Sequence, residues 1–279
     1  MTLHYKPSLI WRTFLFFLLA VVHSQPTAEQ TFNARRTLSL GIVVFPGFEP
    51  LDVFGPLEIF YSLSSRYKIT LSVIAKEPGQ VSAGIPPYRA QDGGPIEDFG
   101  YILRPTVYAT HSFDSAPALD VLLVPGGTGT MAMDQVNDTS ASDFVAARVD
   151  RVDYLLSVCT GAVILANAGV LSGRRATSNK AVWPWIVTHG KNVTWVPTAR
   201  WVQDGNIWTS SGVAAGMDMT YALLAHLYGE EDDGLVSAIN GIEYAPHTNA
   251  SWDPFSVVHK VPGANPNADV ADCVRPVGF

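Results

Sequence analysis

Residues 155–169 read LLSVCTGAVILANAG, and this stretch decides the fold class. An apolar run ends at Cys159, Thr160 and Gly161 follow, and an alanine-rich helical pattern then begins. A strand that turns into a helix at a reactive side chain is the order of a nucleophile elbow, here with cysteine in place of serine. The thiol has three candidate roles at this corner: half of a disulfide, an inert core residue, or a nucleophile.

The rest of the chain alternates strands with helices. Near-continuous apolar runs predict buried parallel strands, and apolar residues at helical spacing predict the helices between them. This alternation predicts a doubly wound α/β sandwich with a parallel central sheet. The predicted strands cover 38–45, 67–75, 119–127 and 154–158, and the predicted helices cover 51–63, 139–149, the stretch after Cys159, and 212–229.

Other regions have weaker patterns. Residues 77–118 are rich in Pro and Gly and predict one or two short strands with a long surface loop. Residues 181–190 look helical, and 194–212 predict strand pieces around a turn. The last part, 244–279, predicts an extended tail laid over a single domain of residues 38–243. Substrate specificity is expected to lie in the 77–118 loop and in this tail.

Residues 1–24 have the pattern of a secretory signal peptide, with an N-terminal helix of the fold as the alternative. Two basic residues, Lys6 and Arg12, precede an apolar stretch of about ten residues, and small residues suit cleavage after Ser24. The stretch is shorter than the roughly 20 apolar residues of a membrane span. Three Asn-x-Ser/Thr sequons also favour a secreted glycoprotein. They begin at Asn137, Asn192 and Asn249.

Composition limits the partners. The 279 residues are 47% hydrophobic and 15% charged, enough for one sizeable core, and the net charge of −7 with no basic cluster argues against nucleic acid. The seven histidines show no metal-ligand spacing, so neither a metal nor another cofactor is expected. His111, His189 and His247 are expected to be surface or loop residues. A small molecule is the expected partner.

The two cysteines, Cys159 and Cys273, raise the question of a disulfide in a secreted chain. Cys273 lies in the polar tail, and a bridge needs the two Cα atoms within ~7 Å. A chain of this length folds without such a bridge. We therefore expect no disulfide.

Three loops follow the carboxyl ends of predicted strands, where open α/β sheets bind ligands. They hold Asp52, the PGGTGT segment of 125–130, and Cys159. The start of a helix is expected to lower the pKa of the Cys159 thiol, and the Thr160 N–H is expected to face an oxyanion. Asp52 beside a thiol is expected to have a raised pKa and to carry the proton that catalysis moves. Its alternative role is a helix N-cap; Glu58 is a weaker acidic candidate, expected to face solvent or a partner subunit.

Four blocks, GIVVFPGFEPLDVFGPLEIF, LDVLLVPGGTGT, SVCTGAVILANAGVLSGRRATS and DGNIWTSSGVAAGMDMTYALLAHLYG, carry a family resemblance. In order and spacing they resemble the ThiJ/PfpI superfamily of class I glutamine-amidotransferase-like proteins, and within it the isonitrile hydratase branch. The resemblance covers roughly residues 38–245. It implies a flavodoxin-like fold, a homodimer and no cofactor.

The resemblance also assigns roles to single residues. Cys159 matches the nucleophile, Asp52 the acidic residue that contacts it, and Gly127 and Thr160 the backbone oxyanion positions. The predicted oxyanion- and substrate-binding residues are therefore Gly127 and Thr160 together with the neighbouring Gly126 and Thr128. The chain departs from the family pattern at two places. Thr160 replaces the histidine that other branches carry after the cysteine, and Ser178-Asn179-Lys180 follows the RAT motif where related hydratases often continue with histidine.

Three functional hypotheses follow. The first is hydration of an isonitrile to an N-substituted formamide, with Cys159 as nucleophile and Asp52 as acid and base. The second is a lyase, cyclase or isomerase of a small secondary metabolite, with Asp52 as general acid and Cys159 auxiliary. The third is a non-catalytic redox-sensing or binding protein, in which Cys159 is reversibly oxidised.

Overall fold

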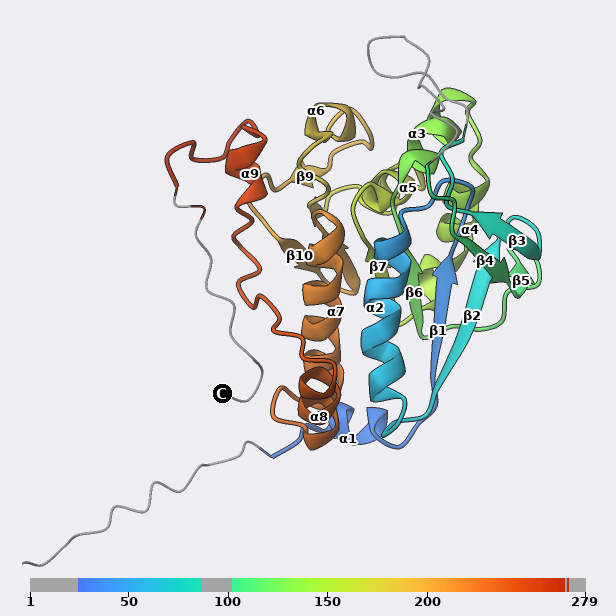
Figure 1. The fold of residues 1–279 in the computed structure, drawn as a ribbon, viewed down its shortest axis with the longest axis vertical. Coiled ribbons are helices and arrows are strands. Elements are labelled where there is room, and N and C mark those ends of the chain that lie inside the picture. Colours follow the sequence, from blue (N-terminus) through green and yellow to red (C-terminus); the bar gives the residue numbers. More distant parts are fainter. Residues whose placement is uncertain (1–24, 87–101, 269, 271–279) are drawn as a thin grey trace, which may run out of the picture.

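A computed structural model describes residues 25–86, 102–268 and 270. Their centre is a seven-stranded sheet in the order β10-β11-β7-β6-β1-β2-β5 (Figure 1). All neighbouring strands are parallel except the edge pair β10 and β11, which is antiparallel. The strands are β1 (Leu38–Val43), β2 (Ile69–Ala75), β5 (His111–Ser112), β6 (Val121–Val124), β7 (Tyr154–Ser157), β10 (Trp201–Asp204) and β11 (Ile207–Ser210).

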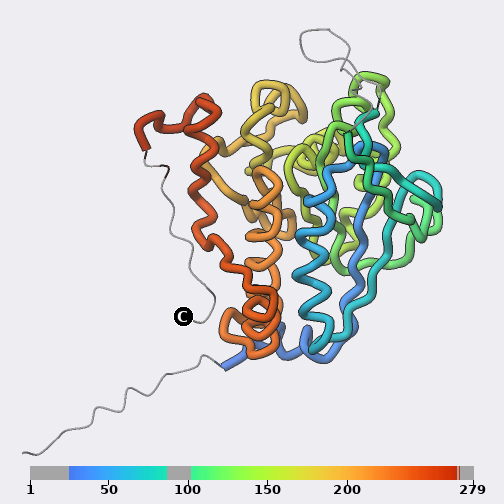
Figure 2. Tube along the Cα trace, viewed as in Figure 1, coloured from blue at the N-terminus to red at the C-terminus, as the bar shows by residue number. Residues whose placement is uncertain are grey.

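Helices cover both faces of this sheet (Figures 1 and 2). On one face α2 (Pro50–Leu63) packs along α7 (Val213–Tyr228), with α1 (Ala28–Asn33) and α8 (Asp233–Gly241) at their lower ends. On the other face α4 (Ser140–Arg148) and α3 (Thr128–Gln135) pack against α5 (Gly161–Asn167). The central strands β6, β7 and β11 are therefore buried at every position, which explains the continuous apolar run of β6.

The doubly wound fold and its four predicted parallel strands are confirmed. The strand pieces predicted in 194–212 are also confirmed, since β10 and β11 form an antiparallel hairpin around the Asp204-Gly205-Asn206 turn at one edge of the sheet. The described residues of the loop region 77–118 hold three short strands rather than one or two, namely β3 (Gly79–Ser82), β4 (Thr106–Ala109) and β5. Short pieces β8 (Arg175–Ala176), α6 (Trp183–Ile186) and β9 (Thr194–Trp195) follow α5.

The C-terminal segment is more structured than an extended tail. It contains a short helix, α9 (Phe255–Val258), and buries the polar side chains of Asp253 and Ser256. The predicted signal peptide lies outside the described residues, as does Cys273. Among the helices that the structure describes, none combines the length and the apolarity needed to cross a membrane.

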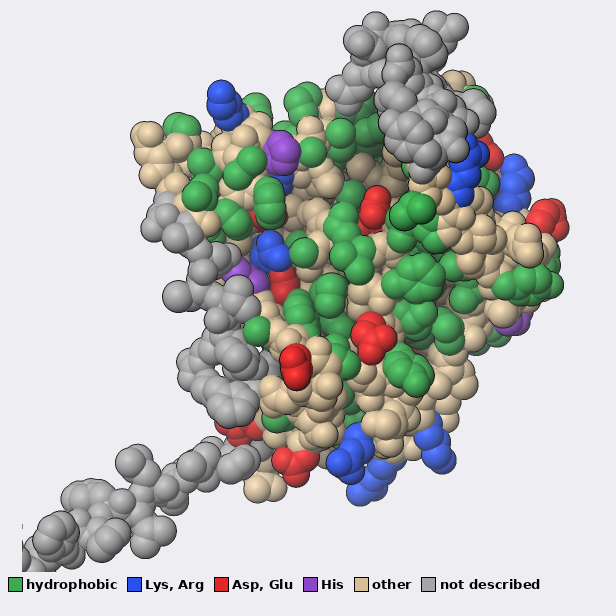
Figure 3. Space-filling view, viewed as in Figure 1, with side chains coloured by type: hydrophobic (Ala, Val, Ile, Leu, Met, Phe, Trp, Pro, Cys, Tyr) green, Lys and Arg blue, Asp and Glu red, His purple; other side chains and the backbone are tan. Residues whose placement is uncertain are grey.

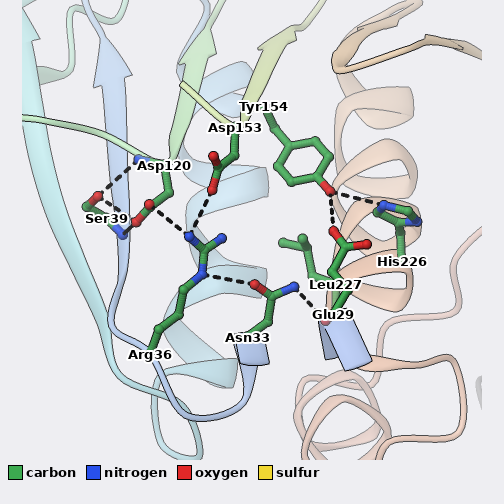
Figure 4. A network of polar contacts seen from close by, with 9 residues as sticks. All are labelled: Glu29, Asn33, Arg36, Ser39, Asp120, Asp153, Tyr154, His226 and Leu227. Carbon is green, nitrogen blue, oxygen red and sulfur yellow. Dashed lines mark hydrogen bonds and ion pairs between the residues drawn. The ribbon is translucent and has the colours of Figure 1, made fainter. Parts of the chain in front are cut away.

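A polar network fixes α1 and the following turn beneath the sheet (Figure 4). Arg36 donates to Asn33 at 2.9 Å, to Asp120 at 3.0 Å and to Asp153 at 2.8 Å. Asp120 also accepts from the backbone and the hydroxyl of Ser39 at 2.6 and 2.7 Å. The Arg36 guanidinium thus links the N-terminal arm, which consists of α1 and the turn after it, to the starts of β1, β6 and β7.

We expect Arg36→Met to lower the free energy of unfolding by about 1–3 kcal/mol, because it leaves charge-assisted hydrogen bonds of the partly buried Asp120 unmade. Urea denaturation followed by circular dichroism measures this change. Arg35→Met, at an exposed neighbouring position, is the matched control. Equal stabilities of the two variants would show that the network does not hold the N-terminal arm.

Candidate functional site

Cys159 sits at the turn between β7 and α5 in a strained backbone conformation. Its φ of 55° lies in the left-handed region, which non-glycine residues rarely adopt. Both backbone groups are held, since its N–H donates to the Ser211 carbonyl at 2.8 Å and its carbonyl accepts from the Ser178 hydroxyl at 2.6 Å. Gly161 lets α5 start against β6, because a Cβ there would meet the Val124 carbonyl oxygen at 2.3 Å. The predicted elbow is therefore present.

Asp52 lies in the first turn of α2 and is completely buried. One carboxylate oxygen, Oδ2, accepts a hydrogen bond from the Gly126 N–H at 2.8 Å. The other, Oδ1, has no well-aligned donor among the described residues, and the carboxyl lies within interaction range of the Cys159 thiol. The N-cap position of α2 belongs to Glu49, so the alternative of Asp52 as an N-cap is wrong.

Burial raises the pKa of Asp52 to about 8. The charge of Glu49 adds to this rise, while the hydrogen bonds from Gly126 and Cys159 oppose it. Glu49 is itself half-buried, and burial raises its pKa as well. The expected upward shift of Asp52 is confirmed, and its carboxyl is largely protonated at neutral pH.

The thiol of Cys159 has a pKa well above its ordinary value, and not below it as the helix-start argument predicted. Burial is the largest cause, and the nearby carboxyl of Asp52 is the second. Donors from Asn179 and from the Thr160 N–H oppose the rise but do not cancel it. The helix-start effect is outweighed because the thiol is removed from water beside an acidic group.

Asn179 is a site residue that sequence reasoning did not assign. Its Nδ2 donates to Cys159 Sγ at 3.1 Å, and its Oδ1 accepts from the Ala181 N–H at 2.8 Å. The second bond fixes which end of the amide faces sulfur. One signal in the sequence could have identified it: Asn179 follows the RAT motif at the place where the chain departs from the family pattern.

The predicted oxyanion residues lie around Cys159, but two of their N–H groups already donate hydrogen bonds within the protein. Gly126 N–H binds Asp52, and Gly127 N–H donates to the Thr160 hydroxyl at 2.9 Å. Gly127 has φ 132°, and a Cβ there would meet the Gly47 carbonyl oxygen at 2.3 Å. The hydroxyl of Thr128 lies 3.5 Å from that same carbonyl. The Thr160 N–H is directed at the thiol, so an oxyanion role for the glycines stays a prediction that requires one of these bonds to open.

Other candidates lie apart from this cluster. Glu58 is exposed on α2, where the Ser62 hydroxyl donates to it at 3.3 Å. His189 pairs with Asp134 at 3.2 Å, and His247 is a loop residue as expected but is buried, not on the surface. The three sequon asparagines are all exposed and outside helices and strands. Cys159 forms no disulfide with a described residue, and because Cys273 lies outside the described residues, the absence of a bridge between them stays a prediction.

A cysteine elbow on a doubly wound sheet, with a buried acid reaching it from the helix after the first strand, defines a class of α/β proteins. The model of the DJ-1/PfpI family matches residues 39–226, and the chain belongs to this family. It is 31% identical over 210 residues to an isonitrile hydratase of Pseudomonas putida, a match that covers 75% of this chain and 79% of that protein.

Two solved structures extend the comparison. A ThiJ/PfpI family protein from Pseudomonas syringae has a TM-score of 0.57 at 28% identity, covering 81% of this chain and 84% of that one. DJ-1beta of Drosophila melanogaster has a TM-score of 0.56 at 20% identity, covering 75% of this chain and 100% of that one, and shows the shared fold alone. The family and the fold that the sequence motifs indicated are thus confirmed.

The raised pKa of Asp52 predicts a pH dependence of stability. Between about 4, its value in the unfolded chain, and about 8, its value in the fold, the folded protein binds more protons than the unfolded one. The free energy of unfolding therefore falls as pH rises through this window. Asp52→Asn removes the titrating group, so urea denaturation at several pH values should show the variant gaining stability relative to wild type as pH rises.

Glu58→Gln, which removes an exposed carboxylate from the same helix, is the control for losing one negative charge. A stability difference between Asp52→Asn and wild type that stays constant from pH 4 to 8 would contradict the buried, protonated state of Asp52.

Proposed function

We propose that this protein hydrates isonitriles to N-substituted formamides. The observation that supports this most is the buried pair of Asp52 and Cys159, in which a protonated acid lies beside a thiol. An isonitrile needs a proton and a nucleophile at the same terminal carbon, and this pair holds both. The likeness to an isonitrile hydratase of Pseudomonas putida supports the same reaction.

The first step adds the thiol across the terminal carbon. The sulfur of Cys159 forms a bond to that carbon while Asp52 gives the carbon its proton, and the thiol proton returns to the Asp52 carboxylate. The product is a thioimidate, R–N=CH–S–Cys. Asn179 and the Thr160 N–H donate to sulfur and stabilise the negative charge that develops there before the bond forms.

The second step adds water to the thioimidate and releases the formamide. Asp52, protonated at the end of the first step, gives its proton to the nitrogen and, as the resulting carboxylate, takes one from the water whose oxygen bonds to carbon, which gives a tetrahedral carbon bonded to OH, S and NH. Collapse breaks the C–S bond, the hydroxyl proton passes through Asp52 to sulfur, and R–NH–CHO leaves. Water is consumed, and the thiol and the acid are regenerated.

A second candidate is a lyase, cyclase or isomerase in which Asp52 alone is the general acid. The raised pKa of the Cys159 thiol favours it, since a thiol held in its neutral form is a weak nucleophile. The raised pKa of this thiol does not favour a redox sensor, because oxidation needs a thiolate that is exposed to the oxidant. Cys159 is only 6% exposed.

Turnover of cyclohexyl isocyanide, with N-cyclohexylformamide measured by gas chromatography, tests the hydratase. We expect Asp52→Asn and Cys159→Ser each to lower kcat by about 10²-fold or more, and Glu58→Gln to leave it unchanged. The wild-type rate should fall as pH rises past about 8, because the acid form of Asp52 is lost there.

The outcomes separate the candidates. Absence of formamide from the wild-type protein rules out the hydratase. Full turnover by Cys159→Ser, with none by Asp52→Asn, rules out the covalent route and favours acid catalysis by Asp52 alone.

We also propose that the protein is a secreted glycoprotein. The exposed positions of Asn137, Asn192 and Asn249 support this, because glycan attachment requires accessible loops. After expression in a eukaryotic secretory host, the protein should be found in the medium, lack residues 1–24 and lose mass on treatment with peptide-N-glycosidase. Retention in the cell with an unchanged mass would contradict export and glycosylation.

We further propose a homodimer, as the resemblance implies. Hydrophobic side chains gather over α2 and α7 on the face shown in Figure 3. On α2, Leu51, Phe54 and Tyr61 are 45%, 42% and 70% exposed, an apolar stripe that a second copy would cover. Sedimentation equilibrium measures the mass, and a monomer at micromolar concentration would contradict this assembly.

A further inference from the structure

A cavity of about 310 Å³ lies between the Asn179 loop, the first turn of α7 and α9. Two of its lining residues are bonded to the elbow. Asn179 donates to Cys159 Sγ at 3.1 Å, and the Ser211 carbonyl accepts from the Cys159 N–H at 2.8 Å. The cavity therefore shares Asn179 and Ser211 with the immediate surroundings of the thiol.

The cavity wall is mainly apolar. Val213, Ala214 and Ala215 form one side, and Phe255 of α9 forms the opposite side. Phe255 is supported by His259, whose ring stacks on it with centroids 6.3 Å apart. Ring-sized and branched hydrocarbon groups fit such a surface, because burying them there removes apolar area from water.

The charged side chains that line this cavity are engaged within the protein, apart from Oδ2 of Asp253, which is buried and has no hydrogen-bond partner among the described residues. Lys180 Nζ makes three hydrogen bonds, at 2.6, 3.2 and 2.9 Å, to oxygens of Thr177, Ser178 and Ala199. Arg200 is paired with Asp218 and lies 3.8 Å from Asp253. These groups are engaged with one another or with the backbone, so the cavity offers a ligand mainly its apolar wall.

The α9 wall is fixed in place. The Asp253 N–H donates to the Thr198 carbonyl at 2.7 Å, and its Oδ1 accepts from the Phe255 N–H at 3.0 Å. The Arg200 N–H donates to the Ala250 carbonyl at 2.8 Å. This wall lies beyond residue 226, where the family match ends, so it belongs to this chain's own C-terminal segment.

We propose that this cavity binds the N-substituent of the substrate and selects isonitriles that carry a ring-sized or branched hydrocarbon group. The inference rests on the proposed hydratase activity and names the substrate class for it. Ala214 and Phe255 determine this specificity by setting the cavity's size, and they take no part in the chemistry.

Kinetics of two substrates test the cavity. In wild type, KM should be lower for cyclohexyl isocyanide than for methyl isocyanide. Ala214→Phe, which fills the cavity, should raise KM for cyclohexyl isocyanide about tenfold and change that for methyl isocyanide less than twofold. Phe255→Ala should also weaken cyclohexyl selectivity, whereas Val258→Ala, an exposed position on the same helix outside the cavity lining, should not. Equal effects on both substrates, or no effect, overturn the proposal.

A binding measurement keeps this result separate from the proposed activity. If wild type turns over no isocyanide, the hydratase fails, and titration calorimetry with N-cyclohexylformamide then decides on the cavity alone. Binding to wild type that weakens at least fivefold in Ala214→Phe, with the unfolding transition of the variant unchanged, supports the cavity. Absence of binding, or equal binding to both proteins, overturns it.

Discussion

The hydrogen bond from the Gly126 N–H to the buried carboxyl of Asp52 is the contact on which the site depends. A second bond runs the other way between the same loops, from the Glu49 N–H to the Gly126 carbonyl at 2.8 Å. Together they join the loop after β1 to the loop after β6, at the edge of the sheet where the β7 elbow also emerges. They leave one oxygen of Asp52 beside the thiol, so the geometry of acid and nucleophile is set by the backbone.

This arrangement explains why the carboxyl of Asp52 and the thiol of Cys159 are both protonated. The protein holds Asp52 and Cys159 in a space from which water is nearly excluded, and charge on either group is unfavourable there. The carboxyl of Asp52 makes ionisation of the thiol harder still, whereas the hydrogen bond from the thiol lowers the pKa of Asp52 and only partly offsets the effect of burial. A neutral acid and a neutral thiol are the result. Such a pair is suited to substrates that accept a proton and a sulfur at one atom, and unsuited to chemistry that begins with a free thiolate.

Sequence reasoning could predict the parts of the site that follow from topology. The alternation of strands and helices places the carboxyl ends of β1, β6 and β7 at one edge, so Asp52, the glycine loop and Cys159 are expected together. The direction of the thiol pKa could not be predicted, because it depends on burial and on a carboxyl 107 positions earlier in the chain. Asn179 was missed for a similar reason, since only the folded loop brings its amide to sulfur.

Local patterns also explain which elements of the fold were missed. Helix α3 begins in the PGGTGT segment, whose glycines predict a turn, and α9 has only four residues and follows a proline. The β10–β11 hairpin, by contrast, could be predicted, because the Asp204-Gly205-Asn206 turn separates its two strands in the sequence.

The buried pair of Arg200 and Asp218 has a consequence for where this domain ends. The Tyr244 hydroxyl and the His247 N–H both donate to Asp218, and Asp253 lies against Arg200. These partners come from beyond residue 226, whereas the ion pair itself lies inside the family match. A chain cut at the family boundary would keep the two charges and lose the groups that satisfy them. We therefore expect the C-terminal segment to belong to the same folding unit, and a chain that ends at residue 226 to be less stable than the full-length protein.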